Sequence, residues 1–132
     1  MKKLSGYGPH LMLDLNGCNE NILDNLDACY SLLKDIPAIV GMTAITQPYV
    51  FRYSGPVPDD QGITGVTIIA ESHISLHTYP RKLFAFVDVF SCKPFDTKRA
   101  TDHIVQFFES KLPIIHIQER GVQFPTSVRL AS

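Results

Sequence analysis

The chain has 132 residues, of which 45% are hydrophobic and 19% charged, and its formal net charge at pH 7 is −1. This length gives one domain, residues 1–132, with a sizeable core, and the composition is typical of a globular protein. The near-neutral charge lacks the basic footprint of nucleic-acid binding, and no apolar run approaches the ~20 residues that cross a bilayer. We therefore expect neither nucleic acid nor membrane as a partner.

The three cysteines, Cys18, Cys29 and Cys92, are scattered and odd in number. This usage is unlike a disulfide framework and is typical of a reducing cytoplasm, which we take as the expected location. No CxxC pair exists, so we expect no metal site of the usual zinc spacing. We interpret Cys18 and Cys29 as structural, since Cys29 lies on the apolar stripe of a predicted helix.

The first predicted elements are a strand over His10–Leu15 and a helix over about Glu20–Lys34. Asn19 is a good N-cap for this helix, because its side chain can accept from the first free backbone N–H groups. Pro37 is expected to end it, since proline lacks the N–H that continues a helix.

A second strand is predicted over Gly41–Tyr53, and Pro48 inside it indicates a sheet edge or a bulge. The proline- and glycine-rich stretch Ser54–Gly62 predicts a loop. The β-branched run Ile63–Ala70 then predicts a third strand.

The second half of the chain predicts a hairpin, a helix and a last strand. Hairpins between the strands favour an antiparallel sheet with both helices packed on one face, a two-layer α+β sandwich. The predicted elements are a strand running up to Tyr79, a strand over Phe84–Ser91, a helix capped by Asp96 or Thr97 and reaching about Lys111, and a strand over Ile114–Glu119.

The stretch AESHISLHTYP, residues 70–80, concentrates reactive side chains on one strand. Its even positions are apolar enough to face the core, while its odd positions carry most of the reactive groups. Ser72 and His77 therefore point to opposite faces of a regular strand. For the two to act together, the backbone near Ser72 must be bulged, strained or cut.

The hairpin register brings a cysteine to the same place. If Tyr79 pairs with Phe84 across the four-residue turn, Glu71 lies opposite Cys92, with Cβ atoms roughly 4.5–5.5 Å apart. A lone thiol is thus predicted beside the Glu71–Ser72 peptide bond. A serine hydrolase is disfavoured, because the GxSxG elbow is absent.

The segment GITGVTIIAESHISLHTYP, followed by FVDVFSC, resembles the processing and active-site region of bacterial and archaeal S-adenosylmethionine decarboxylases. The likeness extends to GPHLMLDL near the start and ERG near the end. It implies a proenzyme that cuts itself between Glu71 and Ser72, giving a β chain of residues 1–71 and an α chain of residues 72–132. Ser72 would become a pyruvoyl group by an N→O acyl shift and elimination. This cofactor would form a Schiff base with S-adenosylmethionine and accept electrons as CO₂ leaves, making the aminopropyl donor for spermidine.

The resemblance also implies roles for particular side chains. His77 matches the residue that handles protons during self-processing, and Cys92 matches the proton donor of decarboxylation. Thr64 stands where the family usually has a serine that assists maturation. Tyr79 occupies a position that stacks on the substrate, and Phe51 or Tyr53 is a candidate for the opposing ring.

One departure leaves the substrate open. After the HTYP turn the family commonly has a glutamate that binds ribose hydroxyls, whereas this chain has Arg81, which cannot accept hydrogen bonds. Arginine or ornithine is therefore an alternative substrate for the same chemistry. A homologue that never cleaves and a metal-binding regulator are further alternatives. The resemblance implies a homodimer of αβ pairs or a higher oligomer.

Overall fold

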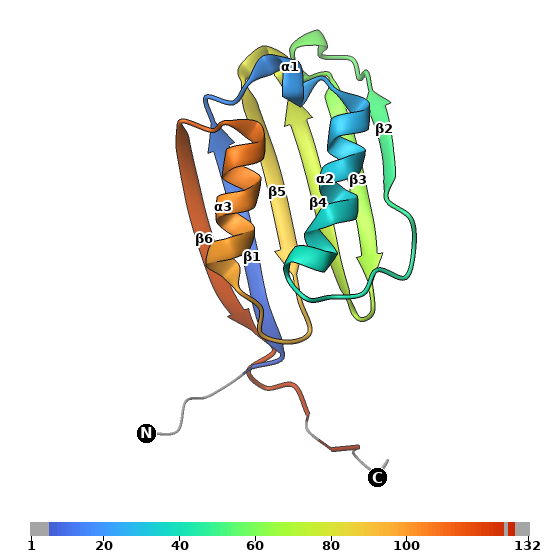
Figure 1. The fold of residues 1–132 in the computed structure, drawn as a ribbon, viewed down its shortest axis with the longest axis vertical. Helices are drawn as coiled ribbons and strands as arrows, with labels where there is room; N and C mark the ends of the chain where they lie inside the picture. Colours follow the sequence, from blue (N-terminus) through green and yellow to red (C-terminus); the bar gives the residue numbers. More distant parts are fainter. Residues whose placement is uncertain (1–5, 126, 129–132) are drawn as a thin grey trace.

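The computed structural model describes residues 6–125 and 127–128, which form a six-stranded antiparallel sheet of order β2-β3-β4-β5-β1-β6 with helices on one face (Figure 1). This arrangement confirms the predicted α+β sandwich. The strands are β1 (Gly8–Asn16), β2 (Tyr49–Tyr53), β3 (Gly62–Ile69), β4 (Ser72–Tyr79), β5 (Phe84–Phe90) and β6 (Leu112–Arg120). The helices are α1 (Glu20–Leu23), α2 (Leu26–Ile39) and α3 (Thr97–Phe108), with 3₁₀ turns η1 (Pro58–Asp60) and η2 (Pro80–Lys82).

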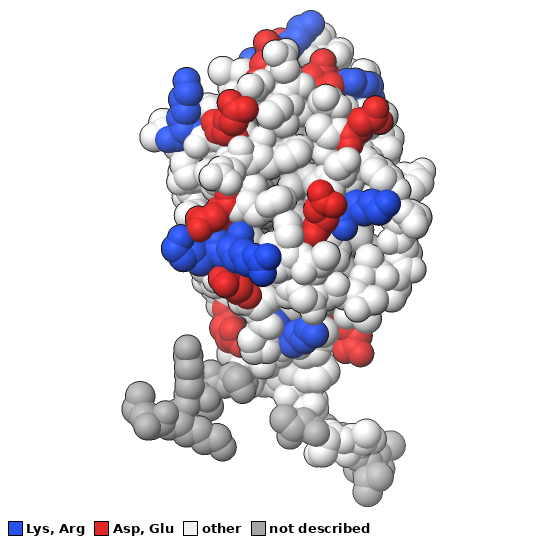
Figure 2. All heavy atoms as spheres, in the orientation of Figure 1, with Lys and Arg blue, Asp and Glu red and all other residues white. Residues whose placement is uncertain are grey.

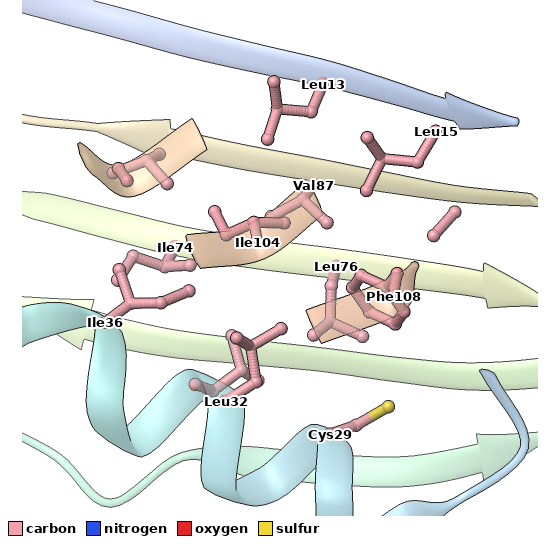
Figure 3. Packing of buried hydrophobic residues seen from close by; sticks show 14 of the residues in the cluster. Leu13, Leu15, Cys29, Leu32, Ile36, Ile74, Leu76, Val87, Ile104 and Phe108 are labelled. Atoms are coloured by element: carbon pink, nitrogen blue, oxygen red, sulfur yellow. The ribbon is translucent and has the colours of Figure 1, made fainter. Parts of the chain in front are cut away.

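The core lies between the sheet and the helices. On β4 the even positions Ile74 and Leu76 are fully buried, as the alternation predicts. They meet side chains of α2 and α3, among them Ile104 and Phe108 (Figure 3). On the helix-covered face, acidic and basic side chains of the described residues are interspersed (Figure 2).

The opposite face of the sheet carries large apolar side chains without a covering helix among the described residues (Figure 1). Strand alternation and the observed register assign the odd positions of β4 to this face. We call it the open face. Its exposed large residues include Tyr49, Phe51 and Tyr53 from β2, Ile68 from β3, and Phe86 from β5.

The first predicted helix is wrong in its boundaries. It is divided into α1 and α2, because Asn25 acts as a second N-cap and accepts from the Ala28 N–H at 2.9 Å. Helix α2 also continues past Pro37 to Ile39. A proline frees the carbonyl four residues earlier, here that of Leu33, and Thr67 Oγ1 of the sheet donates to this carbonyl at 3.4 Å. This tertiary contact offsets part of the lost bond.

Two further boundaries also differ from those predicted. The strand expected over Gly41–Tyr53 is limited to β2, and the residues before it contribute only an isolated bridge between Ala44 and Ile69. Strand β2 lies at the sheet edge, as Pro48 indicated. Helix α3 stops at Phe108 rather than near Lys111, because Glu109 adopts the left-handed conformation (φ 55°) that closes a helix.

Candidate active site

A strained turn joins β3 to β4. Ile69 pairs with Ser72, so the connection has only two residues, and the second of them, Glu71, has φ 60°. For a residue with a Cβ, this left-handed conformation costs roughly 1–2 kcal/mol of conformational free energy. The residue that precedes Ser72, Glu71, is thus one of the few non-glycine residues with a left-handed backbone among the described residues. The Glu71 carboxylate accepts a hydrogen bond from the Tyr7 hydroxyl at 2.9 Å.

Ser72 and Cys92 lie side by side at this turn. The register predicted for the hairpin is confirmed, since Tyr79 pairs with Phe84. Beyond the end of the ladder, the Cys92 N–H donates to Ser72 Oγ at 2.8 Å, and Cys92 Sγ lies 3.6 Å from the carbonyl oxygen of Ala70. Ser72 is buried and Cys92 is half-buried. A thiol and a hydroxyl thus flank the Glu71–Ser72 peptide bond.

The other two cysteines lie in the core. Burial raises the pKa of the Cys18 thiol to about 11 and that of the Cys29 thiol to about 12. Neither forms an appreciable thiolate at neutral pH, and both fill core volume as small apolar side chains. This environment agrees with the structural interpretation of both residues.

At the other end of β4 a cleft of about 440 Å³ opens on the sheet. Thr64 Oγ1 and His77 Nδ1 lie 3.3 Å apart within it, at hydrogen-bonding distance. The structure therefore brings together the aromatic residues and the two polar residues that the sequence singled out. The lining residues are Phe51, Tyr53, Asp60, Gly62, Thr64, His77, Thr78 and Tyr79. We call this the aromatic cleft.

The strained turn and the aromatic cleft are separate within one chain. Ser72 and His77 are five positions apart on β4, which corresponds to roughly 16 Å of strand. Ser72 faces the helix layer, whereas His77 is exposed on the open face. His77 of a single uncut chain therefore does not reach its own Ser72.

Arg81 lies outside the aromatic cleft. Its guanidinium Nη1 is 3.4 Å from Asp59 Oδ1 in an exposed ion pair, and it lines a neighbouring hollow together with Arg52 and Asp24. In this structure the arginine that replaces the family's usual glutamate belongs to a surface ion pair.

Two side chains at these sites carried no sequence signal. Tyr7 reaches Glu71 across 64 positions of sequence, and its ring stacks on Phe90 with centroids 6.0 Å apart. The hydrogen bond to Glu71, then burial, raise the pKa of Tyr7 above its ordinary value. Asp60 enters the aromatic cleft from η1, within the stretch predicted only as a loop. Such contacts depend on tertiary structure rather than on local pattern.

The described residues contain neither a cluster suited to a metal ion nor a helix suited to a bilayer. In residues 6–125 and 127–128, no group of three His, Cys, Asp or Glu side chains is placed to hold a metal ion. Across the same ranges, no helix has the length and apolar character needed to span a bilayer.

A family model, curated relatives and a solved structure all indicate the same protein family. A family model described as S-adenosylmethionine decarboxylase matches residues 9–121. An S-adenosylmethionine decarboxylase proenzyme of Thermodesulfovibrio yellowstonii is 37% identical over 116 residues, covering 87% of this chain and 82% of the relative. One of Thermococcus gammatolerans is 32% identical over 124 residues, covering 93% and 82%. The crystal structure of the adenosylmethionine decarboxylase from Aquifex aeolicus covers 96% of this chain and 99% of its own, with a TM-score of 0.77 and 28% identity. The chain belongs to the S-adenosylmethionine decarboxylase family.

Proposed function

We propose that this protein cuts itself between Glu71 and Ser72, carries the resulting pyruvoyl group, and decarboxylates S-adenosylmethionine to the aminopropyl donor used in spermidine synthesis. The observation that carries the proposal is the placement of Ser72 Oγ and Cys92 at a strained Glu71. Membership of the family, whose relatives are named proenzymes, supports both the cleavage and the substrate.

Self-processing begins with the Ser72 hydroxyl, which attacks the carbonyl carbon of Glu71. The peptide bond becomes an ester, and the Ser72 amine is released. A base then removes the Ser72 α-proton, the Cβ–Oγ bond of Ser72 breaks, and Glu71 leaves with a main-chain carboxylate. Water converts the resulting dehydroalanine to the pyruvoyl group with loss of ammonia. The left-handed Glu71 favours the first step, because breaking its peptide link relieves the strain.

Residues on the open face support the proton transfers. His77 is the proposed base of the elimination, and Thr64, 3.3 Å from its ring, holds the imidazole in one orientation. When present, the pyruvoyl group supplies a carbonyl that accepts electrons as CO₂ leaves. Cys92, beside the residue that becomes this group, returns a proton to the substrate carbon. The residues present therefore fit both the making and the use of the cofactor.

A second copy of the chain would complete the site. Because Ser72 and His77 of one chain lie roughly 16 Å apart along β4, they cannot act on the same atom. The open face exposes aromatic side chains, including Tyr49, Phe51 and Tyr53, at 42% to 69% of their surface. We propose that two open faces pack together, so that the aromatic cleft of one protomer meets the strained turn of its partner. The cytoplasm remains the proposed location, on the basis of cysteine usage.

The substrate is tested by measuring CO₂ release from carboxyl-labelled S-adenosylmethionine, L-arginine and L-ornithine in parallel. The proposal predicts turnover of S-adenosylmethionine. Turnover only of arginine or ornithine would contradict the substrate, and an uncut, inactive chain would contradict the chemistry.

The shared site is tested by complementation. Ser72→Ala lacks the attacking hydroxyl, and His77→Ala lacks the base, so neither variant alone should be cut efficiently. When the two are co-expressed, the His77→Ala chain should be cut, since its partner supplies His77. Failure of co-expression to restore cleavage, with mixed dimers demonstrated by mass spectrometry, would contradict the shared site.

A further inference from the structure

The aromatic cleft contains a carboxylate, that of Asp60, which lies in a stretch that the sequence predicted only as a loop. Asp60 lines the cleft and also an adjoining hollow of about 370 Å³, whose other lining residues are Tyr79, Lys82, Phe84 and Phe86. Among the described residues that line these two hollows, Asp60 is the one acidic side chain. It therefore places a carboxylate, paired with Lys82, within a groove whose other walls are largely aromatic.

Ion pairs hold Asp60 in this position. Its Oδ1 lies 2.6 Å from Lys82 Nζ, and the neighbouring Asp59 pairs with Arg81. The two acids of η1 are thus joined to the two bases of η2. At the end of the loop, the backbone of Gly62 lies so close to Thr78 that a Cβ at this position would collide with the Thr78 carbonyl. The loop that carries Asp60 is therefore held at η2 by ion pairs and, at Gly62, lies against strand β4.

The Lys82 pair leaves Asp60 able to bind a ligand. A carboxylate has two oxygens with about four acceptor sites, and the ion pair uses one side of Oδ1. Two hydroxyls on adjacent carbons match the spacing of such an acceptor, and an aromatic wall suits a purine ring. A nucleoside presents both features together.

We propose that Asp60 is the carboxylate that accepts hydrogen bonds from the ribose hydroxyls of the substrate in the aromatic cleft. Asp60 then fulfils from η1 the function that Arg81 cannot perform. Lys82 and the Asp59–Arg81 pair are positioning residues that hold the η1 loop against η2. This inference rests on the proposed function for the identity of the substrate.

Binding of an unreactive ligand tests the inference separately from turnover. Calorimetry would measure the Kd of 5′-methylthioadenosine and of its 2′,3′-dideoxy counterpart, neither of which has an amino acid to decarboxylate. The purified wild-type protein should bind the diol about tenfold to hundredfold more tightly than the dideoxy form, as expected for hydrogen bonds to a charged group. Asp60→Asn should weaken binding of the diol by a similar factor and abolish most of the discrimination.

Asp102→Asn is the matched control. Like Asp60, Asp102 is an aspartate 2.6 Å from a lysine, here Lys98, but it is exposed and lies on α3 away from the cleft. This variant should bind both ligands as the wild type does. Undiminished discrimination in Asp60→Asn, or wild-type protein that fails to distinguish the two ligands, would overturn the inference. A wild-type protein that discriminates through Asp60 yet releases no CO₂ from S-adenosylmethionine would contradict the proposed function alone.

Discussion

Replacing Glu71 by glycine should slow self-cleavage, because it removes strain from the bond that is to be broken. Glu71 has φ 60°, which costs a residue with a Cβ roughly 1–2 kcal/mol relative to glycine. If this free energy is released on the way to the ester, its removal slows cleavage by up to about 5- to 30-fold. The comparison is between Glu71→Ala and Glu71→Gly, since both delete the carboxylate that contacts Tyr7 and only glycine relieves the strain.

Cell-free synthesis followed by denaturing electrophoresis would time the conversion of the full chain into two fragments. Glu109→Gly is the control, because Glu109 also has a left-handed backbone (φ 55°) but closes α3 far from the turn. It should cleave at the wild-type rate. If Glu71→Gly is cut as fast as Glu71→Ala, strain at Glu71 makes no contribution to processing.

Two further predictions concern Cys92 and His10. Cys92→Ala should still be cut, since the attacking hydroxyl remains, but CO₂ release should fall by about a hundredfold or more; full turnover would exclude Cys92 as the proton donor. Burial lowers the pKa of His10; the charge of Asp88 opposes this shift, and those of Arg120 and His73 add to it. Among the described residues, the buried Nε2 of His10 has no hydrogen-bond partner. The unfolded chain therefore binds a proton first as the pH falls below about 6.5, and folding stability should decrease from there through the lower folded pKa. Urea unfolding would compare the uncut Ser72→Ala protein with the double variant Ser72→Ala/His10→Gln. Between pH 7.5 and 5.5 the free energy of unfolding should fall less in the double variant, and an equal fall in both proteins would contradict this prediction.

The sequence predicted those features that depend on local alternation. The hairpin register followed from turn length, and it correctly brought Cys92 to the Glu71–Ser72 bond. The division of the first helix was not predictable in the same way, because Asn25 lies within a stretch whose apolar spacing is continuous. The continuation of α2 past Pro37 depends on Thr67, a residue of β3 whose position is known only from the fold.

The candidate site likewise contains residues that the sequence identified and residues that only the fold brings there. The family resemblance had already marked Phe51, Tyr53, Thr64, His77 and Tyr79 as candidate site residues, and the structure places them around one cleft. Tyr7 and Asp60 could not be grouped with them. Tyr7 meets Glu71 by folding back from the N-terminal segment, and Asp60 is positioned by ion pairs between η1 and η2.

Self-processing is tested most directly by the mass of freshly purified protein that decarboxylates S-adenosylmethionine. We expect two polypeptides, residues 1–71 and 72–132, and the second should begin with a pyruvoyl group that reacts with hydroxylamine. Ser72→Ala should give one chain of 132 residues. An active preparation that consists of a single intact polypeptide would contradict self-cleavage at Glu71–Ser72.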